Sequence, residues 1–215
     1  MTHVGPRFAV RSFFVLVALG AVGVVAALPV SLALVRDVLA ALPDAPGFSS
    51  SATLALALVN PLVLVAVATL AGLVLAPRVG LRSLLAERAA GRPFDADAWR
   101  AVLPVALAVG AAVGALLVVL DALTATLLVG ELAGQTVTAD RSLAVTVAGV
   151  LYGGVTEEIL LRWGLMSLLA WAFALAARVA RLADATPAGA PSATAMATAI
   201  VVSALLFGLS HLPAL

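Results

Sequence analysis

The residues with the clearest capacity for chemistry are three ionisable side chains in one apolar stretch: Glu157, Glu158 and Arg162. Glu158 and Arg162 are four residues apart and share a helix face, so they can form an ion pair. Glu157 points about 100° away and is left for another partner. The group could simply lock helices together, but a structural salt bridge needs one carboxylate, and a second adds a desolvation cost. The adjacent glutamates therefore indicate a functional site within a membrane.

A second motif near the end of the sequence contains Phe207 and His211, which are four residues apart on one helix face. A single histidine at a helix end is often an interfacial residue without a role. Here, however, Glu157 and His211 lie at similar distances from the loop around Thr186, and their depths differ by about 6 Å at 1.5 Å per residue. We expect their polar atoms to lie within about 7 Å, so that one water or one metal ion can bridge them.

This arrangement makes two structural demands. The four ionisable residues of the two motifs should all face the interior of the bundle, because lipid cannot satisfy them. The two helices should also approach closely at their small residues. The glycines available for this approach are Gly153, Gly154 and Gly208.

Other hydrolytic mechanisms find little support in the sequence. It contains no His-Glu-x-x-His motif, and Asp121 has no second membrane aspartate to pair with. Ser210 precedes His211, but neighbouring helix positions point about 100° apart, which argues against a serine nucleophile with this base. With no cysteine present, a metal ion would have to be bound by Glu, Asp or His. A carboxylate and an imidazole that activate a water are therefore the favoured chemistry.

The two motifs together resemble the CAAX protease and bacteriocin-processing family, also called the ABI family, which includes the type II CAAX prenyl endopeptidases. The matching residues are Glu157-Glu158-x-x-x-Arg162 and, later in the chain, Phe207-x-x-x-His211. The likeness covers residues 143–212, and the earlier segments match only in hydropathy. It implies an intramembrane endopeptidase that hydrolyses a peptide bond near a membrane-bound or lipidated terminus of its substrate.

The resemblance also implies roles for the motif residues. Glu157 is the leading general base, Glu158 assists it, and His211 helps to position and activate the water. Arg162 orients the glutamates, and Phe207 supports the site. Whether the two glutamates and His211 hold a divalent metal such as zinc is left undecided, whereas no nucleotide or organic cofactor is expected. The family pattern continues with a later histidine motif that is absent before Leu215. We therefore expect a site with one uncovered side, and the resemblance does not decide whether this chain is active.

The composition places these motifs in a membrane protein. Hydrophobic residues make up 64% of the 215 residues, charged residues only 11%, and the mean hydropathy is +1.20. Soluble domains contain about 45–50% apolar and 25% charged residues. All 12 basic residues are arginines spread through the chain, and the net charge of +1 gives no basic surface for nucleic acid. The expected partners are membrane lipid and a peptide or protein substrate.

The apolar segments predict an all-α, polytopic transmembrane bundle of about five spans. The first resembles a signal peptide, but its apolar character resumes after Pro29, which favours a retained helix with a kink or a short outer helix. In the polar segment 76–100, leucines on one face predict an interfacial helix. The fourth span is too long for one untilted crossing, so either the helix projects from the bilayer or the glycine pair interrupts it, and we favour a break or kink at the glycines. The predicted spans are residues 13–28, 53–75, 101–123, 143–177 and 193–212.

We therefore expect one membrane-embedded helical domain over residues 1–215. The sequence does not decide whether this domain lacks C-terminal helices of the family fold. The connecting segments are alternately rich and poor in arginine, and the segment before the first span is one of the rich ones. Because basic residues accumulate on the cytoplasmic side, this pattern predicts a multi-pass protein of the cell membrane with a cytoplasmic N-terminus. Two other functions compete with the protease. One is a non-catalytic protein, such as a bacteriocin self-immunity factor or a scaffold, and the other is a proton-coupled transporter that uses Glu157, Glu158 and His211 as a relay.

Overall fold

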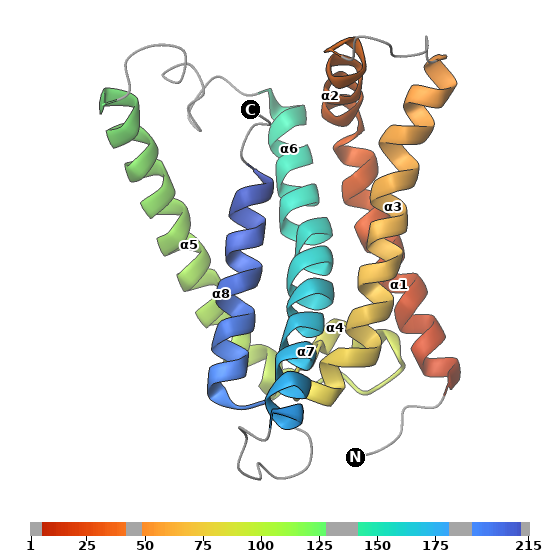
Figure 1. The fold of residues 1–215 in the computed structure, drawn as a ribbon, viewed down its shortest axis with the longest axis vertical. Coiled ribbons are helices and arrows are strands. Elements are labelled where there is room, and N and C mark those ends of the chain that lie inside the picture. The colour runs from red at the N-terminus through yellow and green to blue at the C-terminus, as the bar shows by residue number, and fades with distance from the viewer. Residues whose placement is uncertain (1–5, 42–48, 128–141, 181–190, 212–215) are drawn as a thin grey trace. The chain divides into compact units, whose positions relative to one another are not determined.

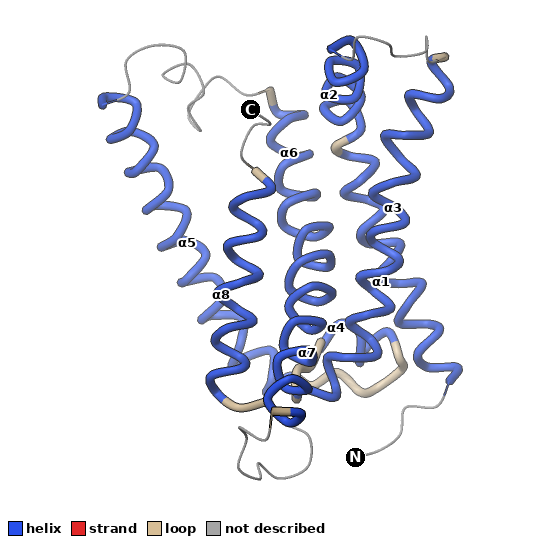
Figure 2. The backbone as a smooth tube through the Cα atoms, viewed as in Figure 1, coloured by secondary structure: helices blue, strands red, loops and turns tan. Residues whose placement is uncertain are grey.

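The protein is an all-α polytopic membrane bundle, as predicted. The computed structural model describes residues 6–41, 49–127, 142–180 and 191–211, and these ranges contain helices and no strand (Figures 1 and 2). Among these residues, four helices are long and apolar enough to cross a membrane alone: Ser50–Val79, Ala96–Thr124, Leu143–Val179 and Ala193–Ser210. Two further helices, Val10–Ala26 and Leu28–Ala41, make a fifth span if this bent pair is counted as one.

The chain divides into two compact units, Met1–Arg92 with Val147–Leu215, and Pro93–Thr146. The second unit contains α5 (Ala96–Leu127), whose first turn is capped by Asp95 through a 3.0 Å hydrogen bond from the Ala98 amide. The single domain expected from the sequence stays a prediction.

The first helix bends sharply where the sequence indicated a kink. Helix α1 (Pro6–Ala26) and α2 (Leu28–Ala41) meet at an angle of 64°. Pro29 explains the bend, because it has no amide hydrogen and its ring clashes with the carbonyl four residues earlier. Hydrogen bonding resumes with the Ser31 amide, which donates to the Ala27 carbonyl at 3.0 Å.

Helix α3 (Ser50–Leu75) begins at Ser49, whose side chain accepts a hydrogen bond from the Ala52 amide. It continues into the short turn η1 (Ala76–Val79), which ends at Gly80 with a left-handed φ of 76°. The predicted interfacial helix follows as α4 (Leu84–Ala89), which is only six residues long. Its position is fixed because the Ser12 hydroxyl of α1 donates to the Ala86 carbonyl at 2.7 Å.

The longest helix runs without interruption through the first motif, so the expected break at Gly153 and Gly154 is wrong. At this point the winding loosens from α to π, in which each amide bonds five residues back. The Glu157 amide, for example, donates to the Tyr152 carbonyl. Two glycines lower the preference for α winding, and the helix adapts by widening. Its consecutive segments are α6 (Leu143–Leu151), η3 (Tyr152–Thr156), η4 (Glu158–Leu165) and α7 (Met166–Val179).

The long helix is the centre of the first unit. Its π-helical part packs against α1 and α3, where Val24, Val65 and Ile159 form one buried cluster. Its last part packs against α8 (Ala193–Ser210), and there Ala170 and Ala199 are buried together with Val79. The long helix therefore links the N-terminal helices to the helix that ends at His211 (Figure 1).

The closest helix approaches do not use the glycines named from the sequence. A Cβ atom at Gly154 or Gly208 would meet nothing within 4 Å in the described part of the chain. At Gly164, in contrast, a Cβ atom would lie 2.5 Å from Ala68 Cβ and 2.8 Å from Ala68 Cα. A Cβ atom added at Gly23 of α1 would similarly lie 2.6 Å from the Leu151 carbonyl oxygen. Close approaches at glycine thus join the long helix to α1 and α3 rather than to α8, where it packs through alanines.

Replacement of Gly164 by alanine is expected to destabilise the bundle by about 1–3 kcal/mol, the usual cost of overpacking. The new methyl group would meet the backbone of α3, which cannot move aside as a flexible side chain can. Thermal unfolding in detergent measures the effect. Gly154→Ala is the matched control and should be neutral or stabilising by up to about 1 kcal/mol. Equal unfolding temperatures for the two variants would contradict the described α3 contact.

Two buried threonines provide a second comparison. The Thr156 hydroxyl donates to the Gly20 carbonyl at 2.8 Å, whereas Thr69 Oγ1 has no hydrogen-bond partner among the described residues. Valine has nearly the same shape as threonine, so Thr156→Val should cost about 1 kcal/mol by loss of the bond. Thr69→Val should leave the unfolding temperature unchanged or raise it. A larger loss for Thr69→Val than for Thr156→Val would show that the two hydroxyl groups are wrongly assigned.

Candidate functional site

Glu157 occupies the single residue between the two π-helical segments η3 and η4. Its neighbours hold this part of the backbone against the N-terminal helices. Thr156 is fully buried and bonded to Gly20 of α1, and Ile159 is buried in the cluster with α1 and α3. The Glu157 side chain is 20% exposed, which agrees with the expected interior orientation. A Cβ atom at Gly153 would lie 3.5 Å from Glu157 Oε2, so the missing side chain leaves one carboxylate oxygen uncrowded.

His211 caps the end of α8, and Phe207 holds it in place. Its Nδ1 lies 2.9 Å from the Phe207 carbonyl oxygen. The two rings are 4.4 Å apart in an edge-to-face arrangement. Because a carbonyl only accepts, this contact is a hydrogen bond when Nδ1 carries the hydrogen. In that neutral tautomer the lone pair is on Nε2.

The two motifs meet at these atoms. His211 Nε2 lies 3.7 Å from Glu157 Oε1, within the separation predicted from the sequence. The distance exceeds that of a direct hydrogen bond, about 2.7–3.2 Å. A water placed beside the pair, about 2.8 Å from each atom, could hydrogen-bond to both. The predicted approach of Glu157 to His211 is thus confirmed.

Glu158 and Arg162 form the predicted ion pair, with 2.9 Å between Glu158 Oε1 and Arg162 Nε. Their side chains are 48% and 74% exposed, however, and that of His211 is 55% exposed. Within this unit the prediction that all four residues face the interior therefore holds for Glu157 and is wrong for the other three. The reason is that α1 and α3 cover the face with Thr156 and Ile159, which leaves Glu158 and Arg162 on the outer face. The His211 imidazole is exposed within this unit, and the open side expected from the sequence stays a prediction.

Arg162→Ala is expected to lower the thermal stability in detergent more than Arg162→Lys does. Lysine keeps a positive charge that can reach Glu158, although it cannot reproduce the fork geometry of the guanidinium group. Because both side chains are exposed, the difference should be small, about 0.3–0.5 kcal/mol. The Glu158→Gln background is the control, since the two Arg162 variants should become equivalent there. Equal stability of the two variants beside the intact Glu158 would count against this pairing.

A metal ion is not favoured by the residues in place. In the described part of the chain, no three His, Asp or Glu side chains gather closely enough to hold one. Zinc sites use three or four protein ligands, whereas here Glu158 turns to Arg162 and only Glu157 and His211 come together. The three-residue metal site considered from the sequence is therefore not formed by these residues.

The sequence does not predict two contributors to the site, the π winding and Thr156. The π winding turns Glu157 towards α8 and leaves Glu158 beside Arg162. It also places Tyr152 one π turn before Glu157, on the same face. Thr156 fixes the depth of this segment through its bond to α1. The glycine pair was the available signal, but it was interpreted as a break. The Ser210 hydroxyl donates to the Phe207 carbonyl at 2.7 Å and lies 3.4 Å from His211 Nδ1, so the argument against a serine nucleophile stays a prediction.

Fold and site together define a class: an integral membrane protein whose described residues include four or five helical segments long and apolar enough to cross a membrane, with a carboxylate–imidazole pair between two helices. Comparisons with protein-family models, curated proteins and solved structures found no match.

Proposed function

We propose that this protein is an intramembrane endopeptidase of the CAAX-protease type, which hydrolyses a peptide bond near a membrane-bound or lipidated terminus of its substrate. The observation that carries the proposal is the 3.7 Å separation of Glu157 Oε1 and His211 Nε2. These residues belong to two motifs far apart in the sequence, and both have the side chains that water activation needs. An ion pair that only joined two helices would not require the second glutamate.

In the proposed reaction, a water lies between Glu157 and His211. Glu157 accepts a proton as the water oxygen attacks the carbonyl carbon, and His211 Nε2 holds the second hydrogen and thus directs the oxygen lone pair. The carbon–nitrogen bond of the tetrahedral intermediate then breaks, and protonated Glu157 returns its proton to the departing amine. Atoms and charge balance without a cofactor. Arg162 keeps the Glu158 carboxylate away from this water.

The experiment is a comparison of protein termini in cells that produce the wild type or Glu157→Gln. Mass spectrometry of the membrane fraction should find new termini, in or next to apolar segments, only with the wild type. Identical termini in both samples would contradict the proposal and favour a scaffold or a self-immunity factor. Glu157-dependent proton flux into liposomes, without any cleavage, would instead favour a transporter.

We also propose that the N-terminus lies in the cytoplasm and that the protein resides in the cell membrane. The start of α1 contacts α4 through Ser12, and residues 76–92 around α4 contain four arginines and one glutamate. Cytoplasmic segments accumulate basic residues. His211 ends α8 at the opposite end of the unit from α4 (Figure 1). The site would then be closer to the outer face than to the cytoplasm.

Cysteine labelling tests this orientation without background, because the natural sequence has no cysteine. Ser51 lies in the first turn of the span Ser50–Val79, Leu85 lies beyond its other end, and both residues are exposed. In intact cells, a membrane-impermeant maleimide should label Ser51→Cys but should label Leu85→Cys only after permeabilisation. The reverse pattern would place the N-terminus outside.

A further inference from the structure

We propose that the arginines around α4 form a binding site for the headgroup of an anionic phospholipid. This arginine patch consists of Arg78, Arg82, Arg88 and Arg92. The proposal does not depend on the peptidase activity, because the patch and the Glu157–His211 pair use different residues.

The patch lies at the end of a membrane span, where lipid headgroups are the nearest anions. The span ends at Val79 with Arg78 in its last turn, and the other three arginines follow it; within residues 76–92 Glu87 is the only acidic residue. Four positive charges against one negative charge leave three in excess. Each basic residue near an anionic membrane surface strengthens the attraction to it. A guanidinium group also matches the geometry of a phosphate with two parallel hydrogen bonds.

The backbone of this segment is fixed rather than free. Ala86 and Ala90 are buried against the unit, and Ser12 of α1 bonds to the Ala86 carbonyl. On the same segment Arg78 and Arg88 are exposed, and the Arg82 and Arg92 side chains are 57% and 41% exposed. The small apolar side chains thus attach the segment to the bundle while the guanidinium groups project away from it. A fixed backbone lowers the entropy lost when a headgroup binds.

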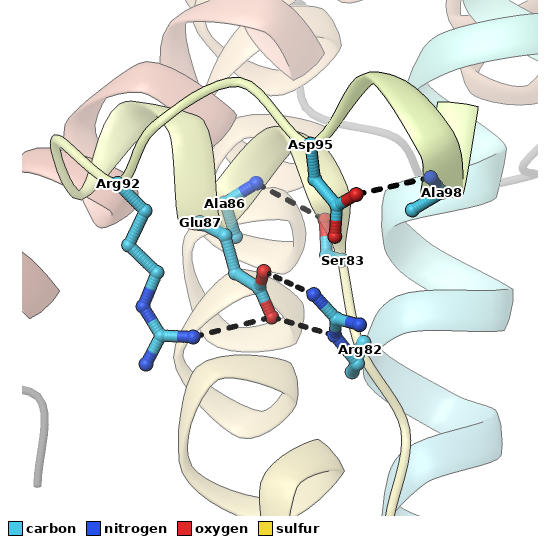
Figure 3. A network of polar contacts seen from close by, with 7 residues as sticks. All are labelled: Arg82, Ser83, Ala86, Glu87, Arg92, Asp95 and Ala98. Carbon is cyan, nitrogen blue, oxygen red and sulfur yellow. Dashed lines mark hydrogen bonds and ion pairs between the residues drawn. The ribbon is translucent and has the colours of Figure 1, made fainter. Parts of the chain in front are cut away.

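Glu87 orders two of the four arginines (Figure 3). Arg82 donates to both Glu87 oxygens, at 3.0 and 2.8 Å, and Arg92 approaches Oε1 at 3.5 Å from the other side. One carboxylate therefore holds two guanidinium groups near each other without neutralising both. Arg88 bonds to the Arg92 carbonyl at 3.4 Å, and Arg78 has no ion-pair partner among the described residues. These two arginines are the best placed to receive a phosphate group.

The test titrates dioleoylphosphatidylglycerol, an anionic lipid, into the purified full chain in neutral detergent and measures thermal unfolding. Phosphatidylcholine, which carries a phosphate but no net charge, is the first control, and inorganic phosphate is the second. We expect saturable stabilisation by the anionic lipid alone. Removal of one arginine should weaken the apparent Kd about fivefold, so Arg78→Gln with Arg88→Gln should weaken it about 25-fold.

The matched control is Arg36→Gln in α2, a helix at the opposite end of the unit from α4 (Figure 1), and this variant should leave the Kd unchanged. Arg88→Lys should lose less affinity than Arg88→Gln, because the charge remains. If the double variant does not fold, Arg78→Gln alone carries the test. Equal effects of the two lipids, an unchanged Kd in the arginine variants, or the same stabilisation by inorganic phosphate would overturn the proposal. The last result would identify a site for free phosphate.

Discussion

Glu157→Gln is expected to reduce peptide-bond hydrolysis by about 10²–10⁴-fold, the usual contribution of a general base. Glutamine has the same shape but cannot accept the proton of the water. Because Glu157 is 20% exposed and makes no contribution to the buried cluster around Ile159, the variant should fold normally. The measurement is the rate at which termini found only with the wild type appear after expression is induced.

Glu158→Gln is the matched control for this effect. Glu158 pairs with Arg162 at 2.9 Å, and its side chain is 48% exposed, so its loss should disturb the position of the site and not the proton transfer itself. We expect a smaller loss of rate than for Glu157→Gln. A larger loss for Glu158→Gln, at equal protein level and unfolding temperature, would exchange the roles of the two glutamates.

His211→Asn is expected to reduce the rate of hydrolysis by about 10²-fold. The asparagine amide nitrogen can occupy the place of Nδ1 and keep the hydrogen bond to the Phe207 carbonyl, but nothing replaces Nε2. The variant therefore removes only the atom that faces Glu157. The same measurement of termini, together with the unfolding temperature, separates a catalytic loss from misfolding.

Ser210→Ala serves as the control at the neighbouring position. The Ser210 hydroxyl donates to the Phe207 carbonyl and lies 3.4 Å from His211 Nδ1, so it helps to order the helix end without facing Glu157. We expect its rate to stay close to that of the wild type. If Ser210→Ala lost as much activity as His211→Asn, a serine nucleophile would have to be reconsidered.

The spans were predictable because the membrane itself restricts the sequence. A helix needs about 20 apolar residues to cross the hydrocarbon core, and the runs that end near Leu75 and begin near Leu143 satisfy this rule without reference to tertiary contacts. The bend before Pro29 was also predictable, because proline lacks the amide hydrogen wherever it stands. The apolar solvent therefore determined the spans, and the covalent structure of proline determined the bend.

The contacts between helices were much less predictable. Gly208 and Gly164 look equivalent in sequence, but only Gly164 meets a neighbouring backbone. Where a helix is apolar on every side, the pattern does not indicate which face meets another helix. The π winding was missed for a related reason. A change from i−4 to i−5 hydrogen bonds over a few residues leaves no distinct period in the sequence.

At the site, the approach of Glu157 to His211 was predictable, whereas the exposure of Glu158 and Arg162 was not. The meeting of Glu157 and His211 depends on their depth along two helices, which residue counting gives within about one turn. The exposure of Glu158 and Arg162 depends on which face α1 and α3 cover. That choice is made by the close approaches at Gly23 and Gly164, which only the structure shows.

The most direct test of a single Glu157–His211 site is the double variant, Glu157→Gln with His211→Asn, compared with each single variant in the same measurement of termini. Residues that act on one water are strongly non-additive, because the loss of either one already abolishes the shared function. The double variant should therefore be about as slow as Glu157→Gln alone. If its loss instead equals the product of the two single losses, or if either single variant retains the wild-type rate, the two residues do not form one hydrolytic site.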